Sequence, residues 1–332
     1  MNNLVKDQNV ISPALHSALI AKARRFFPLL SPEAGVHTMM EWAQTPQANF
    51  LLVTPTHFSR LTEISGYPNL LFVRGNAALL TRPSLAIVGT RRPSPYGVRS
   101  ALFFSRELAR LGYVMVSGLA RGIDAAAHRG ALDVKGSTIA IVGHGLDRVY
   151  PANHHDLSEQ IVAEGGCLVS EYPPGIAPLR HHFPERNRLL SGVSLGTLVI
   201  EAAEQSGSLI TARHALEQNR EVFVVPGPFD ELSFRGGHQL IQQGAKLTCE
   251  VADIVEELEA SLRFFPSAKR QEESAFHPAI RELLAEAFRK NSGTLDLEQL
   301  REEGFTAQTI ADGIHSGWVR EIFPQHFIWV GK

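Results

Sequence analysis

Apolar and polar positions alternate in blocks between residues 85 and 225. Uninterrupted apolar runs of strand length occur at residues 85–88, 114–116, 138–142, 168–169, 197–200 and 222–225. Segments with apolar residues at helical spacing separate or follow them, at residues 96–111, 122–132, 154–164, 183–191, 208–218 and 237–243. Continuous apolar strands that alternate with helices are typical of a parallel sheet covered on both faces. The pattern predicts an α/β fold with a doubly wound, mostly parallel sheet.

The flanking segments predict smaller units. Residues 1–65 contain five prolines among short helical patterns and predict a small helical N-terminal domain. Residues 66–262 predict the sheet domain, with a lead-in strand at 70–73 and a closing helix at 251–262. Residues 263–275 are polar and charged, as in a linker. Residues 276–332 show three helical segments (277–290, 297–303 and 307–315) and a hairpin (318–322 and 327–330), which together predict a winged-helix module.

The charge of the chain is unevenly distributed. The formal net charge of −2 argues against a protein that coats nucleic acid with its whole surface. Between Arg82 and Lys135, however, nine basic residues face only three acids, and a local field of that sign attracts a polyanion. Three of these basic residues lie in predicted loops: Arg91, Arg92 and Arg121. A position on the solvent-facing side of a helix therefore does not account for their charge.

Small loops follow the first three strands of the predicted sheet, at the edge where such sheets bind ligands. They span residues 89–92, 117–122 and 143–147. Glycine lets backbone N–H groups approach an anion closely, and a neighbouring arginine binds phosphate with two hydrogen bonds. We expect anion contacts from Gly89, Thr90, Arg91, Arg92, Ser117, Gly118, Arg121 and Gly122. The alternative is that each glycine serves only its turn.

A second cluster lies at residues 181–188 (His-His-Phe-Pro-Glu-Arg-Asn-Arg). Single-stranded nucleic acid binds to cationic grooves with aromatic side chains, so Phe183 is a candidate for base stacking, and Arg186 and Arg188 for phosphate contacts. Alternatively, Phe183 anchors the core, and the arginines pair with Glu171 or Glu201. Gly207 and Ser208 begin a further helix after the strand at 197–200 and form another anion-binding turn.

Several functional classes lack their motifs. The chain has no G-x-x-x-x-G-K-[ST], and no G-x-G-x-x-G follows its first strand, which argues against a P-loop ATPase and a dinucleotide oxidoreductase. We find no nucleophile–base arrangement, so we expect no catalytic residue, and we expect no cofactor. The histidine pairs at 154–155 and 181–182 lack metal-ligand spacing. Cys167 and Cys249 are expected to be reduced, and we expect a cytoplasmic protein without a membrane helix or export signal.

Several motifs together resemble one family, the bacterial DNA-processing protein A family. They are IVGTRRPSPYG (87–97), VSGLARGIDAAAHRGAL (116–132), STIAIVGHGLDRVYPANH (137–154), SEYPPG (170–175), HFPERNRLLSG (182–192), EAAEQSGSLITARHALEQNR (201–220), VFVVPG (222–227) and LIQQGAK (240–246). The resemblance runs from about residue 70 to residue 251. It implies an extended Rossmann-like fold that binds single-stranded DNA, protects it, loads the recombinase RecA onto it during natural transformation, and forms homodimers without catalytic turnover.

The resemblance also implies site residues. Carried over by position, Arg91, Ser117, Gly118, Arg121, Gly122, Arg186, Asn187 and Arg188 line the DNA groove, and Asn153 lies in a matching motif. Family members often carry a basic residue after the Tyr-Pro pair, where this chain has Ala152. In residues 277–332, eight acids outnumber six basic residues, so we expect this module to contact protein or regulate rather than bind DNA.

A rival hypothesis is a nucleotide-binding Rossmann-like enzyme or sensor of the phosphoribohydrolase kind. Gly196-Thr197 and Glu201 resemble part of the P-G-G-x-G-T-x-x-E signature of those enzymes, but the Pro-Gly-Gly is missing. A mononucleotide also does not require the cluster at 181–188. A third hypothesis is a scaffold with a vestigial pocket.

Overall fold

The computed structural model describes residues 13–53, 58–264, 278–291, 294–303, 305, 309, 319–323 and 326–329. The chain divides into two compact units, Met1–Ala260 and Ser261–Lys332. Within the described part of the chain, we find no helix with the length and apolar character needed to cross a membrane.

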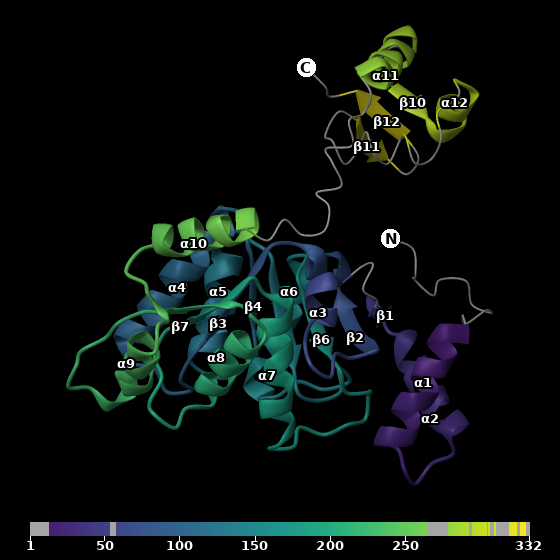
Figure 1. The fold of residues 1–332 in the computed structure, drawn as a ribbon. Coiled ribbons are helices and arrows are strands. Elements are labelled where there is room, and N and C mark those ends of the chain that lie inside the picture. Colours follow the sequence, from purple (N-terminus) through teal and green to yellow (C-terminus); the bar gives the residue numbers. More distant parts are fainter. Residues whose placement is uncertain are drawn as a thin grey trace. The chain divides into compact units, whose positions relative to one another are not determined.

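The first unit is built on a nine-stranded sheet with the order β1-β2-β6-β5-β4-β3-β7-β8-β9 (Figure 1). The strands are β1 (Ala48–Leu52), β2 (Leu70–Gly75), β3 (Ser84–Val88), β4 (Val114–Ser117), β5 (Thr138–Val142), β6 (Cys167–Ser170), β7 (Gly196–Val199), β8 (Glu221–Val224) and β9 (Lys246–Leu247). The pairs β1–β2 and β2–β6 are antiparallel, and all other neighbours are parallel. The predicted α/β fold with a mostly parallel sheet is confirmed.

The order of the strands reverses beside β3. The chain runs outward from β3 through β4 and β5 to β6, and then returns to place β7 on the other side of β3. The loops that follow β3 and β7 therefore leave the sheet in opposite directions. This divergence opens a crevice at the carboxyl ends of the strands, which is where doubly wound sheets bind ligands.

Helices cover both faces of the sheet (Figure 1). One face packs against α3 (Ser59–Thr62), α7 (His182–Val193), α8 (Gly207–Glu217) and α9 (Arg235–Gln242). The other packs against α1 (Pro13–Phe26), α2 (Pro32–Ala43), α4 (Pro95–Arg110), α5 (Ile123–Asp133), α6 (His155–Ala163) and α10 (Val251–Phe264). Short 3-10 turns occupy Ala77–Thr81, Ala152–His154 and Leu232–Phe234.

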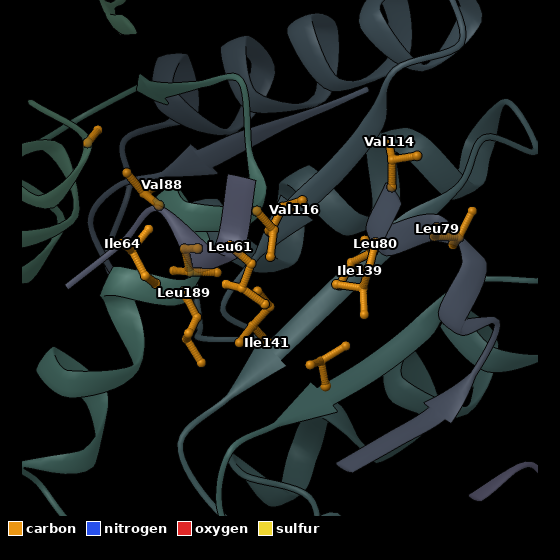
Figure 2. Close-up of a cluster of buried hydrophobic side chains, with 14 of the residues drawn as sticks. Leu61, Ile64, Leu79, Leu80, Val88, Val114, Val116, Ile139, Ile141 and Leu189 are labelled. Atoms are coloured by element: carbon orange, nitrogen blue, oxygen red, sulfur yellow. The ribbon is translucent and has the colours of Figure 1, made fainter. Parts of the chain in front are cut away.

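The strands contribute alternate side chains to the two faces. In β5, Ile139 and Ile141 join one apolar cluster, whereas Ala140 and Val142 join the other. Figure 2 shows Ile139 and Ile141 in the first cluster together with Leu189 of α7. Both faces of the strand are buried, which explains why its sequence reads as a continuous apolar run.

The N-terminal region contains a strand besides the helices that the sequence predicts there. Ala48–Leu52 forms strand β1, which pairs with β2, and Phe50 packs against Phe72 and Trp42 with ring centroids 5.7 Å and 6.1 Å away. The sheet thus includes residues on both sides of the expected boundary at residue 65. A five-residue edge strand is stabilised by its pairing with the neighbouring strand, so its own sequence does not predict the strand conformation.

The second unit contains α11 (Pro278–Lys290), β10 (Thr294–Asp296), α12 (Leu297–Glu302), β11 (Val319–Phe323) and β12 (His326–Trp329). Its sheet has the order β10-β12-β11, and Leu284, Phe288, Leu295, Leu300 and Val319 form its core. The third expected helix, at residues 307–315, lies outside the described residues except for Thr309. The winged-helix assignment stays a prediction.

Candidate nucleic-acid interface

A groove of about 620 Å³ opens at the crevice beside β3. Segments that follow β3, β4 and β7 contribute to it, together with the start of α7. Eight of the fifteen residues predicted from the sequence line it: Gly89, Thr90, Arg91, Phe183, Arg186, Asn187, Gly207 and Ser208. The fold therefore brings together the loop after the first predicted strand, the cluster at 181–188 and the turn at 207–208.

Glu201 holds the loop after β3 in place. The backbone N–H of Thr90 donates to the Glu201 carbonyl at 2.8 Å, and the Glu201 carboxylate accepts from the backbone N–H and the hydroxyl of Ser94 at 3.0 Å and 2.8 Å. Ser94 in turn caps α4 by accepting from the N–H of Gly97. Glu201 is 2% exposed and braces a helix start rather than an arginine.

The loops after β3 and β4 pack tightly against each other. Gly122 has φ +79°, and a Cβ at this position would lie 2.8 Å from the carbonyl carbon of Arg91. The next residue, Ile123, donates its backbone N–H to the Thr90 carbonyl at 3.2 Å. Gly122 therefore serves the close approach of two loops, as the turn alternative proposed, and it does not line the groove.

One wall of the groove is aromatic and cationic. The Phe183 ring lies 5.6 Å from the Tyr150 ring, and the Arg91 guanidinium lies over Phe183 at 5.5 Å from its centroid. Phe183 is half-buried, Tyr150 is 44% exposed and Arg91 is exposed. Phe183 therefore presents a surface to the groove and is not a core anchor.

The floor carries two buried charges of opposite sign. Asp124 accepts from the backbone N–H groups of Gly118 at 3.0 Å and Ala120 at 3.3 Å through one oxygen, Oδ2. Arg186 donates through Nη1 to the carbonyls of Gly118, at 3.0 Å, and Ile141. Burial raises the pKa of Asp124, against the opposing effect of Arg186 and the two N–H groups, and burial lowers the pKa of Arg186 to about 10.

The start of α8 forms a further wall of the groove. Ser206 caps this helix, and its hydroxyl lies 2.6 Å from that of Ser208. Asn187 of α7 donates to the Gly207 carbonyl at 3.3 Å and links the two helices. The positive end of the helix dipole favours an anion at this wall.

Seven predicted residues do not line the groove: Arg92, Ser117, Gly118, Arg121, Gly122, Asn153 and Arg188. Arg188 pairs with the Glu171 carboxylate, as the alternative interpretation expected, and Glu171 also binds Lys22 of α1 at 3.4 Å. The Ser117 hydroxyl donates to the Ile87 carbonyl at 2.7 Å and is fully buried. Ser117 and Arg188 therefore stabilise the fold around the groove.

Tyr150, Arg180 and Asp124 line the groove but were not among the predicted residues. Arg180 immediately precedes the cluster at 181–188, so extending that basic run by one residue would have found it. Asp124 is an acid directly after a glycine-rich turn in a basic segment, a weak signal in hindsight. The direction of the Tyr150 side chain depends on loop packing, which the sequence does not reveal.

The histidines and cysteines that the structure describes form no metal site. No group of three potential His, Cys, Asp or Glu ligands is close enough to hold a metal among the residues that the structure describes. Nδ1 of His154 lies 2.9 Å from the Leu119 carbonyl, which gives this histidine a structural role. Cys167 and Cys249 are both free thiols.

A family model described as DNA recombination-mediator protein A matches residues 50–259 of the chain. Protein Smf of Escherichia coli is 42% identical over 250 residues, which cover 75% of this chain and 66% of that protein. The chain thus spans about two thirds of the length of this relative.

Two solved structures share the fold. The X-ray structure of DNA processing protein A from Streptococcus pneumoniae has a TM-score of 0.63 and 38% identity, over 70% of this chain and 79% of that one. The protein of the same name from Helicobacter pylori has a TM-score of 0.58 and 32% identity, over 65% of this chain and 98% of that one. The Helicobacter structure is described as giving insights into a unique single-stranded DNA binding mode.

Proposed function

The chain belongs to the DNA recombination-mediator protein A family, and we propose that it binds single-stranded DNA in the groove beside β3. The proposal rests chiefly on one observation, the wall formed by Arg91, Phe183 and Tyr150. An exposed cation beside two accessible aromatic rings is the combination that holds a flexible strand by phosphate attraction and base stacking.

The groove separates these two roles. Arg91 and Arg180 are exposed at its mouth, where phosphates keep most of their hydration. Phe183 and Tyr150 offer ring surface to the bases, and the positive end of the α8 dipole attracts a further anion. A duplex buries its base faces and does not supply this surface, so the groove favours a single strand.

The wider role that we propose is the one that membership of this family suggests. We infer that the protein protects an incoming strand during natural transformation, hands it to RecA, and acts as a homodimer in the cytoplasm. The DNA undergoes no chemical change in this role. Two joined grooves on one strand would raise avidity, because the second contact becomes intramolecular.

The rival phosphoribohydrolase-like function finds less support. It depends on Glu201 as a reactive carboxylate, yet this side chain is 2% exposed and is engaged by Ser94. An assay that detects release of a free base from a nucleoside monophosphate would support this rival function.

The proposal is tested by fluorescence anisotropy with labelled oligo-dT and a duplex of equal length at several salt concentrations. We expect tighter binding of the single strand and an affinity that falls with salt by a slope of about −0.7 per phosphate contacted. Equal affinity for the duplex, or binding that is indifferent to salt, contradicts the proposal. Faster assembly of RecA filaments on the bound strand tests the inferred handover.

A further inference from the structure

A carboxylate is an unexpected component of a groove for a polyanion. Asp124 lines the same groove as Arg91 and Arg180, but it is only 7% exposed and lies at the floor. The Arg186 cation beside it offsets this charge, so the exposed cations Arg91 and Arg180 are the groups that hold the phosphate backbone of a bound strand, at the mouth of the groove. The bases are then the part of the strand that turns toward the floor.

The hydrogen bonds of Asp124 and Arg186 described above each involve a single atom of the charged group. Oδ2 of Asp124 accepts from two backbone N–H groups, and Nη1 of Arg186 donates to two carbonyls. Within the described part of the chain, Oδ1 of Asp124 and Nη2 of Arg186 have no hydrogen-bond partner. Unlike Nε of Arg186, which is buried without a partner, neither atom is sealed from solvent.

Gly118 keeps these two groups apart and accessible. A Cβ on Gly118 would lie 2.6 Å from Nη2 of Arg186 and 2.7 Å from Oδ2 of Asp124. The two charged groups thus flank the glycine without forming a direct ion pair in the described structure. A larger residue at this buried position would displace both groups from where they line the groove.

The chemistry that fits is the Watson–Crick edge of a base. All four bases place a hydrogen-bond donor next to an acceptor on this edge: the amino group beside the ring nitrogen in adenine and cytosine, and the imino group beside a carbonyl in guanine and thymine. In a duplex these groups are engaged by the opposite base. An unpaired base offers them freely, and proteins read single strands through this edge.

We propose that Asp124 and Arg186 form a donor–acceptor pair that reads the free Watson–Crick edge of an unpaired base in the groove. This inference rests on the proposed function, because it assumes that the groove holds a single strand. Oδ1 of Asp124 accepts a hydrogen bond from the N–H donor of the base, and Nη2 of Arg186 donates a hydrogen bond to the neighbouring acceptor. Since all four bases carry such a pair, the device selects unpaired bases without selecting a sequence.

The test alters the ligand and leaves the protein intact. An oligo-dT is compared by anisotropy with an oligomer of the same length that carries difluorotoluene, a base with the shape and stacking surface of thymine but without its strong hydrogen bonds. We expect the analogue to bind about tenfold more weakly or worse, which is the effect of losing hydrogen bonds to charged groups. Homopolymers of T, C and A should bind within about fivefold of each other.

A substitution of Asp124 completes the test. In Asp124→Asn the cost of the analogue should shrink, whereas Asp133→Asn, a charge change at the other end of the same helix, should leave that cost unchanged. Equal binding of thymine and difluorotoluene by a wild-type protein whose affinity depends on Arg91 overturns the edge-reading inference alone. Failure to bind either oligomer, or indifference to Arg91, overturns the proposed function as well.

Discussion

The guanidinium of Arg91 lies 5.5 Å from the centre of the Phe183 ring, although the first residue follows β3 and the second opens α7. The ring attracts the cation and holds it at the mouth of the groove. A strand that enters there meets a fixed charge and a ring face side by side. This contact joins two segments that the sequence presents separately.

Replacing Arg91 by alanine should weaken binding of oligo-dT by about tenfold at low salt, because one phosphate contact is lost. The dependence of log affinity on log salt should become shallower by about 0.7. Anisotropy at three or more salt concentrations measures both. Arg129→Ala removes an equal charge from the exposed side of α5 and is the matched control. An equal loss in both variants would assign the effect to net charge instead of the groove.

Phe183→Leu should cost about 1 to 3 kcal/mol of binding free energy, because leucine keeps apolar volume but offers no ring for a base to stack upon. Phe183→Tyr should bind close to wild type. Isothermal titration with oligo-dT distinguishes the two. If Phe183→Leu binds as tightly as Phe183→Tyr, the ring does not stack on a base.

The close contacts around Gly118 predict that a larger residue there lowers stability and weakens binding. In Gly118→Ala the new methyl group collides with Arg186 and Asp124, so we expect a loss of about 1 to 3 kcal/mol in unfolding free energy together with weaker strand binding. Gly207→Ala is a contrasting variant for stability, because no atom lies within 4 Å of its added Cβ. Urea unfolding curves should therefore separate the two variants, and superimposable curves would contradict the tight geometry at Gly118.

A buried histidine predicts how stability depends on pH. Thr138 donates its hydroxyl proton to the Met115 carbonyl, so Nδ1 of His128, 2.8 Å away, is the donor to the Thr138 oxygen. Burial lowers the pKa of His128 from 6.5 to about 3, with smaller effects from His154 and Arg186. In this range the unfolded chain binds a proton that the folded protein does not. The free energy of unfolding therefore falls as the pH drops below 6.5.

This contribution disappears in His128→Asn, which lacks the titrating group. The stability advantage of the wild type over this variant should shrink by roughly 2 kcal/mol between pH 7 and pH 5. Urea unfolding at the two pH values measures the difference. A gap that stays constant would show that His128 does not resist protonation in the folded state.

The sequence predicted the fold where local pattern and tertiary environment agree. Parallel strands such as 138–142 are buried at every position and apolar at four of the five, so their run is visible without a structure. Strand β1 was missed because it is short and half-buried, and its strand conformation depends on pairing with β2. The pairing of β2 with β6 is likewise a property of the whole sheet.

The site was predicted in part for a related reason. Loop glycines and arginines mark an anion-binding edge, but the sequence does not say which side chains turn inward. Arg186 and Arg188 lie on the same helix two residues apart, yet one reaches the floor of the groove and the other pairs with Glu171. Helical geometry places such neighbours on different faces, and only the packing of α7 decides which face is used.

The location of the strand is the central claim, and photo-cross-linking tests it most directly. An oligonucleotide of about 16 residues that carries iododeoxyuridine is bound to the wild-type protein, irradiated, and mapped by mass spectrometry after digestion. We predict cross-links to the peptides that contain Phe183 and Tyr150, and their loss when unlabelled oligo-dT competes. Cross-links confined to α10 or to residues 278–329, with none in the groove, would contradict the account.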